Sequence, residues 1–197
     1  GLKVVPSSLI RLKSGELGYI TKRIDRTADR QKIHMLDMFQ ILEAFDKYKG
    51  SYEKIGKAIG QHSVNTNLDK INYLELLLFC FLTGNNDMHL KNFSLIDGSN
   101  GWTLSPAYDL LNVALVLPED KEEMALTIEG KKSNIKRKQF ENLGKELGLT
   151  EKQISGVFNR LVKKKPLVED WIRKSFLSTE MQKTYVEITA KRFDLLK

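Results

Sequence analysis

The sequence predicts an α+β fold that is mostly helical, with its β structure confined to short hairpins. Apolar and polar residues alternate near the N-terminus and around residues 92–106, which is the period of β-strands. From residue 136 to the C-terminus, apolar residues instead recur at helical spacing. The 197 residues, 41% apolar and 29% charged, are those of an ordinary globular domain that is long enough to bury a core.

The N-terminal residues have the pattern of a β-hairpin. Strand-like segments cover residues 2–12 and 17–24, and the intervening sequence KSGE supplies turn chemistry at Gly15. We therefore expect residues 1–26 to form a unit of their own beside a helical body that spans residues 27–197.

Two helices are expected after the N-terminal hairpin. In residues 34–45, apolar side chains recur at helical spacing from Met35 to Phe45. Residues 68–84, LDKINYLELLLFCFLTG, are apolar nearly all round, which is typical of a helix at the centre of a fold. Gly84 is expected to end this helix, because glycine readily adopts the left-handed conformation found after helix C-termini.

A second hairpin and four further helices are expected in the rest of the chain. Residues 92–97 and 101–106 flank the turn sequence GSN and alternate like paired strands. Residues 124–132 are expected to add one more strand. The four helices are expected over residues 137–148, 150–165, 166–176 and 178–196.

Composition limits the classes of function. No run of 18 apolar residues is present, so no membrane-spanning segment is expected. The single cysteine, Cys80, lies in an apolar run, and a buried thiol fits a reducing, cytoplasmic compartment. The net charge of +7 is compatible with nucleic-acid binding. However, the Lys and Arg residues are scattered and their clusters lack interleaved aromatic residues, so a solvated surface is the simpler interpretation.

Several polar side chains are crowded directly after the expected central helix: Asn86, Asp87, His89, Lys91 and Asn92. Asp87 precedes Asn92 by the catalytic-loop spacing of phosphoryl transferases. In such enzymes one acid lies near the attacking hydroxyl, while an amide and a second acid hold Mg²⁺. Asn92 opens the second hairpin and Asp109 follows it, so Asp87 is the candidate base and Asn92 and Asp109 are the candidate metal ligands.

Two simpler interpretations of this stretch compete with the kinase-type site. A polar loop rich in Asn and Asp is common after a helix, and Asp and Asn recur at this spacing by chance in many proteins. The following hairpin and the sequence PAYDL make the whole constellation more specific. A zinc site has little support, because no histidine has the required spacing with Glu and a second histidine.

These segments resemble the C-terminal part of the HipA family of serine/threonine protein kinases, the toxins of HipA–HipB toxin–antitoxin systems. The resemblance covers essentially the whole chain and rests on YITKRIDR, HMLDMFQILEAFDKYKGSYEKI, TGNNDMHLKNFSLI, LSPAYDLL and LTIEGKK. The chain departs from the family at Ile24, where phenylalanine is usual. The Asp-x-His-x-x-Asn pattern is also similar to phosphoinositide kinases, whereas aminoglycoside phosphotransferases carry a histidine where this chain has Asn85.

The resemblance implies a kinase-like C-terminal lobe over residues 27–197, with residues 1–26 as a hairpin and hinge left from the N-terminal lobe. It implies ATP and Mg²⁺ as ligands, with Asp87 as general base. The residues implied to face the nucleotide phosphates or the metal are His89, Lys91, Asn92, Tyr108 and Asp109, of which Asn92 and Asp109 would hold Mg²⁺.

The resemblance also implies a hinge that contacts the adenosine part of ATP. The backbone of Lys22, Arg23 and Ile24 would form hydrogen bonds with adenine, and Asp25 would lie near the ribose. Without the family context, the same residues are equally well explained as an ordinary strand end.

Two elements of a complete kinase cannot be found in this sequence. No Gly-rich phosphate-binding loop and no strand Lys paired with a helix Glu can be placed before residue 26. We therefore expect this part to be supplied upstream in the same polypeptide or by another one, and the chain alone to be inactive.

The resemblance implies partners as well. These are a protein substrate, with aminoacyl-tRNA synthetases among the family's targets, and a HipB-like antitoxin through which DNA would be reached indirectly. The alternative function is a helical module without catalysis, which would bind an antitoxin, a repressor or DNA through the basic helices after Lys131.

Overall fold

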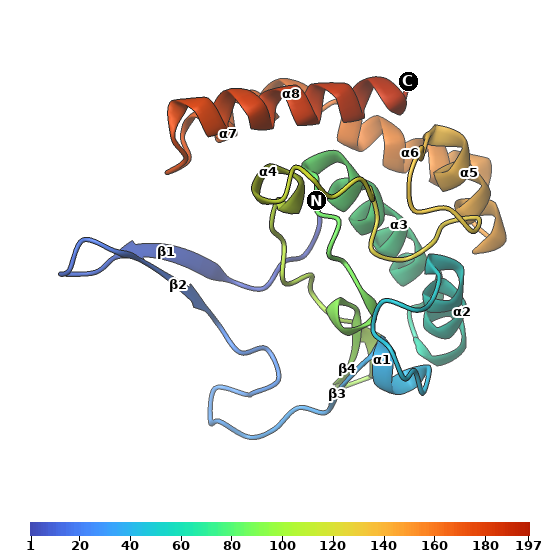
Figure 1. Cartoon of the computed structure of the whole chain (residues 1–197). Helices are drawn as coiled ribbons and strands as arrows, with labels where there is room; N and C mark the ends of the chain where they lie inside the picture. Colours follow the sequence, from blue (N-terminus) through green and yellow to red (C-terminus); the bar gives the residue numbers. More distant parts are fainter.

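The structure is a computed structural model that describes all residues from Gly1 to Lys197. A β-hairpin projects from a body that consists of a small sheet and several helices (Figure 1). The C-terminal helices lie along one side of the body, and the N-terminus lies close to its middle (Figure 1). None of the helices combines the length and the hydrophobicity of a membrane-spanning segment.

The projecting hairpin consists of β1 (Ser7–Arg11) and β2 (Leu17–Thr21), which pair antiparallel as the alternation predicted. Gly15 makes the turn with a φ of +91°. Both faces of the hairpin are exposed to solvent. The chain before it is fixed to the body, because the Val5 N–H donates a hydrogen bond to the carbonyl of Ala107 (2.9 Å).

The body contains a three-stranded antiparallel sheet in the order β3-β4-β5. The expected second hairpin is present as β4 (Ser94–Gly98) and β5 (Gly101–Leu104). The third strand, β3 (Met35–Asp37), pairs along β4.

The helix predicted over residues 34–45 is wrong, because the first part of this segment forms strand β3. Only one turn of helix is present there, α1 (Met38–Ile41). The Asp37 side chain caps it by accepting a hydrogen bond from the Gln40 N–H (2.9 Å), and the chain leaves the helix at Glu43, whose φ is +50°. The strand forms because its backbone pairs with β4, a partner distant in sequence that local periodicity cannot reveal.

The central position of the apolar helix is confirmed. This helix, α3 (Thr66–Thr83), packs against α2 (Tyr52–His62) and the C-terminal helices, and all residues from Tyr73 to Leu82 except Phe79 are buried. Cys80 is among the buried residues, and burial raises the pKa of its thiol.

Two buried acids of α3 are paired with partners from other elements. The Glu75 carboxylate accepts a hydrogen bond from the guanidinium of Arg160 (2.6 Å). The Asp69 carboxylate accepts hydrogen bonds from the Leu104 N–H (2.7 Å) and from the hydroxyl of Ser63 (2.6 Å). A buried charge is tolerated only with such partners, so both pairs fix the position of α3.

Gly84 ends α3 with a φ of +72°, as expected. A Cβ atom at this position would lie 2.9 Å from Oδ1 of Asn112, so the close approach of the two segments also requires glycine. The Ala114 N–H then donates a hydrogen bond to the Gly84 carbonyl (3.0 Å). The start of the polar stretch is thereby fixed to the segment that follows Asp109.

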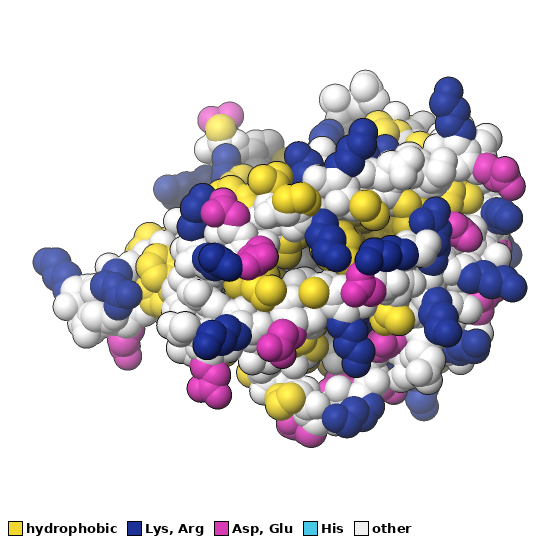
Figure 2. All heavy atoms as spheres, turned by 90° about the horizontal axis from the view of Figure 1, so that it is seen from above, with side chains coloured by type: hydrophobic (Ala, Val, Ile, Leu, Met, Phe, Trp, Pro, Cys, Tyr) yellow, Lys and Arg dark blue, Asp and Glu magenta, His cyan; other side chains and the backbone are white.

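The remaining chain is helical after residue 136, as predicted. These helices are α5 (Arg137–Glu146), α6 (Glu151–Val162), α7 (Lys165–Arg173) and α8 (Thr179–Leu195). A single helical turn that was not predicted, α4 (Val113–Val116), precedes them. On the face seen from above, Lys and Arg side chains are interspersed with acidic and apolar ones (Figure 2).

The strand expected over residues 124–132 is wrong. This segment makes only isolated bridges, although Met124, Leu126 and Ile128 are buried.

Leu78→Ala should lower the free energy of unfolding by about 2–5 kcal/mol, because truncating a buried leucine leaves a cavity. Leu78 is fully buried in α3. Leu68, on the same helix, is 56% exposed and provides the control, with an expected loss below about 0.5 kcal/mol for Leu68→Ala. Chemical denaturation measures both values. Equal small losses in the two variants would contradict the central position of α3.

Candidate active site

The candidate site lies where the polar stretch after α3 meets the segment after β5. The polar stretch, residues 85–92, leaves α3 at its C-terminus and ends in a single 3₁₀ turn, Leu90–Asn92, directly before β4. The second segment, residues 105–110, follows β5. Because β4 and β5 are paired, the ends of both segments are held side by side.

Asn92 joins the two segments. Its side chain is 6% exposed, and its amide nitrogen donates hydrogen bonds to the backbone carbonyl of Asp87 (3.0 Å) and to Oδ2 of Asp109 (3.0 Å). The three residues that the sequence singled out as base and metal ligands are therefore gathered by one buried amide.

The backbone of Asp109 has an uncommon conformation. Its φ is +56°, in the left-handed region where Asp and Asn are among the few residues other than glycine that occur. Asn85 supports this conformation, because its side-chain amide donates a hydrogen bond to the Asp109 carbonyl (3.2 Å). The Asp109 side chain is left exposed.

Asp87 is held by a different neighbour, Tyr48. The Tyr48 hydroxyl donates a hydrogen bond to Oδ1 of Asp87 (2.9 Å), and the Asp87 N–H donates one to Oδ1 of Asn85 (3.3 Å). Burial and the hydrogen bond to Asp87 raise the pKa of the Tyr48 phenol, so it remains a proton donor. Tyr48 thus orients the carboxylate without competing for its charge.

His89 lies beneath this pair as a neutral imidazole. Its ring contacts Tyr48 edge-on, with 5.2 Å between ring centroids, and the residue is 6% exposed. Burial, together with the nearby charge of Lys47, lowers the pKa of His89 below its usual value of 6.5. Nδ1 of the ring has no hydrogen-bond partner. Lys91, by contrast, is exposed and places its ammonium 4.8 Å from the centre of the Phe39 ring.

Tyr108 connects the two segments of the site through its hydroxyl group. Its hydroxyl donates a hydrogen bond to the Lys91 carbonyl (2.8 Å) and accepts one from the hydroxyl of Ser94 (2.5 Å). Burial raises the pKa of Tyr108 to about 12. The tyrosine therefore ties the segment before Asp109 to the end of the polar stretch.

The predicted hinge residues are not gathered with the others. They follow β2, where the Lys22 N–H donates a hydrogen bond to the Pro6 carbonyl (2.9 Å). Arg23 pairs with Asp25, with 2.8 Å between Nε and Oδ1, and this hydrogen bond lowers the pKa of Asp25 to about 2. Ile24 is partly buried between them. Asp25 also pairs with the guanidinium of Arg26 (2.7 Å), so the polar contacts of these side chains are all local.

Two clefts adjoin one another near the site, and Leu111 lines both of them. A cleft of 780 Å³ lies between the hairpin and the body, and Asn92, Tyr108 and Asp109 line it. It reaches Thr21 but none of the hinge residues that follow. A second groove, of 560 Å³, is lined by Asp87 but not by Asp109. The two candidate carboxylates therefore face different spaces.

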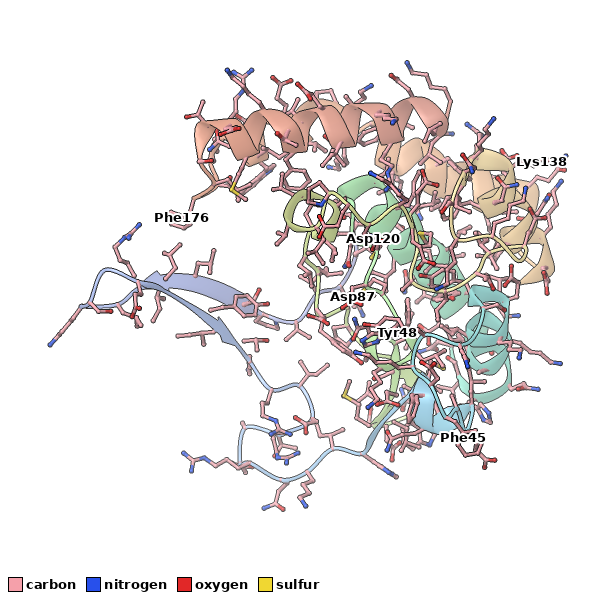
Figure 3. The ribbon with its side chains drawn as sticks, viewed as in Figure 1. Phe45, Tyr48, Asp87, Asp120, Lys138 and Phe176 are labelled. Carbon is pink, nitrogen blue, oxygen red and sulfur yellow. The ribbon has the colours of Figure 1, made fainter.

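Sequence reasoning gave no role to several residues that shape the site: Tyr48, Asn85, Ser94 and Asp120. Figure 3 shows Tyr48, Asp87 and Asp120 near one another, although they come from different parts of the chain. The sequence gives only weak indications of these roles. Asn85 lies within the polar stretch, and Tyr48 lies in a Lys-Tyr pair that is part of the family resemblance. Their contacts depend on the tertiary structure.

The donor atoms fit a hard divalent cation such as Mg²⁺. No hydrogen bond engages Oδ1 of Asn92 or Oδ1 of Asp109, so one amide and one carboxylate oxygen are free to act as ligands. No group of three or more His, Cys, Asp or Glu side chains could hold a metal by itself. Mg²⁺ accepts a site with few protein ligands, because it keeps several waters and binds substrate phosphates.

Comparison with solved structures confirms the mixed α/β fold class. HipA of Shewanella oneidensis, solved as a toxin–antitoxin system with HipB and operator DNA, matches 99% of this chain with a TM-score of 0.79 at 19% identity. The match covers 51% of that HipA chain. The proinflammatory kinase CtkA of Helicobacter pylori matches 99% of this chain and 74% of its own, with a TM-score of 0.63 at 16% identity.

Comparison with curated sequences gives relatives that carry kinase names. A Sinorhizobium fredii protein named "Putative kinase Y4dM" is 33% identical over 138 residues, which cover 68% of this chain and 33% of that protein. A Haemophilus influenzae protein named "Putative kinase" is 31% identical over 109 residues, which cover 50% of this chain and 32% of that protein. This chain thus spans about a third of each relative.

The family model described as "HipA-like C-terminal domain" matches residues 1–171, which is most of the chain. The match includes the polar stretch, the second hairpin and the segment of Asp109. The chain belongs to the family of HipA-like C-terminal domains.

Proposed function

We propose that this chain is the catalytic lobe of a HipA-like protein serine/threonine kinase, which transfers the γ-phosphate of ATP to a protein hydroxyl. The observation that supports it most is the buried Asn92 amide, which connects the backbone of Asp87 with the carboxylate of Asp109. A scaffold without catalysis has no need for this arrangement. The family and the kinase names of its curated relatives agree with the proposal.

In this proposal each carboxylate has a separate task. Asn92 and Asp109 would hold Mg²⁺, which supplies charge neutralisation on the phosphates when it is bound. Asp87 would accept a hydrogen bond from the substrate hydroxyl and take its proton while the oxygen bonds to the γ-phosphorus. The bond from the γ-phosphorus to the bridging oxygen breaks, and ADP leaves with that electron pair. Tyr48 would keep the Asp87 carboxylate oriented.

The nucleotide would occupy the cleft of 780 Å³ between the hairpin and the body. Its volume is in the range of small-molecule sites. His89 and Lys91 would lie toward the phosphates, and Lys22 to Asp25 would approach adenosine only if the hairpin moves closer to the body. In this view residues 1–26 are part of an N-terminal lobe and residues 27–197 are the C-terminal lobe.

A further region is needed for activity. Phosphoryl transfer depends on positioning and on neutralising phosphate charge, and kinases use a Gly-rich loop and a strand Lys for this. The chain contains neither before residue 26, and the residues that match it make up only about a third of each curated relative. The exposed apolar residues of the hairpin that do not line the cleft, among them Ile10 and Ile20, offer a surface on which that region would pack.

The proposed partners follow from the structural neighbour. HipA of Shewanella oneidensis was solved with HipB and operator DNA. We extend this to a HipB-like antitoxin for the protein that contains this chain, with DNA contacted through the antitoxin.

In the complete protein, Asp87→Ala should lower phosphate transfer by about 100-fold or more, because a general base contributes this much. Its affinity for ATP should stay nearly unchanged. Asp109→Ala should lower both the transfer and the affinity for Mg·ATP. Radiolabel transfer from ATP and calorimetry measure the two effects. Asp97→Ala removes an exposed carboxylate of β4 and serves as control. Undiminished transfer by the Asp87→Ala variant would exclude Asp87 as the base.

The chain of residues 1–197 alone should transfer no phosphate above background, while the complete protein does. The reason is that the chain keeps the residues for the hydroxyl and the metal but lacks those that cradle the phosphates. The same radiolabel assay compares the two proteins at equal concentration. Circular dichroism confirms that the chain alone is folded. Robust transfer by the chain alone would show that no further region is required.

A further inference from the structure

We infer that the 560 Å³ groove beside Asp87, the acceptor groove, binds the substrate segment that carries the hydroxyl, and prefers a segment with Lys or Arg next to an apolar residue. This inference rests on the proposed kinase function. The residues of the acceptor groove that carry the argument are Tyr48, Asn86, Asp87, Val116, Asp120 and Glu122.

The two candidate carboxylates line different but adjoining spaces. Asp109 and Asn92 line the cleft on the hairpin side, whereas Asp87 lines the acceptor groove, which meets that cleft at Leu111. A base must face the molecule that carries the hydroxyl, and metal ligands must face the phosphates. The acceptor groove is therefore the space from which a hydroxyl reaches Asp87.

The lining of the acceptor groove is acidic. Asp87, Asp120 and Glu122 line it against a single cation, Lys132, which already pairs with Glu122 (3.0 Å). This local excess of acids contrasts with a chain whose net charge is +7. Such a groove attracts a cationic segment and repels the phosphates of nucleic acid.

One residue of the acceptor groove, Asn86, carries a buried acceptor without a partner. Asn86 is 6% exposed, and its amide nitrogen donates hydrogen bonds to Oδ2 of Asp120 (2.8 Å) and to the Glu122 carbonyl (3.0 Å). These two acceptors fix the orientation of the amide, so its oxygen, Oδ1, is the atom without a partner. A buried acceptor without a donor is uncommon. Asn86 Oδ1 has almost no accessible surface, so an N–H of a bound peptide would satisfy it only after a small movement of the groove wall.

The same contacts hold the acidic side chain in place. Oδ1 of Asp120 accepts a hydrogen bond from the Glu122 N–H (2.9 Å), while Oδ2 is bound by Asn86. Asp120 is thus an oriented charge rather than a mobile one, and Figure 3 shows it near Asp87 and Tyr48.

The acceptor groove also has an apolar side. Val116 of α4 is 65% exposed, and Leu117 and Leu111 are 46% and 45% exposed. Apolar side chains this exposed beside fixed acids suit a ligand that brings both an apolar residue and a cation. A peptide segment with a hydroxyl residue, an apolar residue and Lys or Arg meets all of these features.

The test uses the complete protein and synthetic peptides that contain one serine and one leucine. The peptides differ only at the flanking positions, which are Arg, Gln or Glu. We expect kcat/KM for radiolabel transfer to be about tenfold higher for Arg than for Glu peptides, the size of a modest charge interaction. The double variant Asp120→Asn, Glu122→Gln should reduce this ratio to about threefold or less, with the KM for ATP unchanged.

Glu151→Gln is the matched control, because it removes an acid whose side chain is 89% exposed on α6. It should keep the full preference for Arg peptides. Equal transfer to Arg, Gln and Glu peptides would overturn the inference while leaving the kinase function intact. A preference that survives in the double variant would overturn the assignment to the acceptor groove. Transfer to no peptide and to no protein would overturn both the inference and the proposed function.

Discussion

The arrangement of the site depends on one buried amide. The Asn92 side chain donates one hydrogen bond to the backbone of Asp87 and one to the carboxylate of Asp109. It can do so because the 3₁₀ turn that carries it is held between α3 and β4. The buried helix α3 therefore supports the site. The polar stretch begins at the left-handed Gly84 that ends α3, and it leads into strand β4.

Most of the site's composition could be predicted from the sequence, because its signals are local. The spacing of Asp87 and Asn92, the apolar run of α3 and the glycine that ends it lie within a short stretch. Strand β3 could not be predicted, since Met35–Asp37 fit a helical period and become a strand only by pairing with β4. The contact between Tyr48 and Asp87 likewise depends on tertiary structure. The hinge was placed by resemblance, and the structure does not bring it to the cleft.

The two carboxylates differ in environment as well as in position. Asp87 is partly buried, receives a hydrogen bond from a tyrosine and faces a groove lined by other acids. Asp109 is exposed on a left-handed backbone and faces the larger cleft. The two acids line different spaces that adjoin at Leu111. A reaction between two substrates requires such an arrangement, in which each substrate has its own space and the reacting atoms meet where the spaces join.

The central claim is that the metal and the phosphates belong on the side of Asn92 and Asp109. A crystal structure of the complete protein with Mg²⁺ and an ATP analogue that cannot be hydrolysed tests it most directly. We predict the metal at about 2.0–2.1 Å from Oδ1 of Asn92 and from the Asp109 carboxylate, the distance that Mg²⁺ prefers. The triphosphate should lie in the cleft beside Tyr108, with Asp87 free of metal. Mg²⁺ bound to Asp87, or phosphates in the groove beside Asp120, would contradict the account.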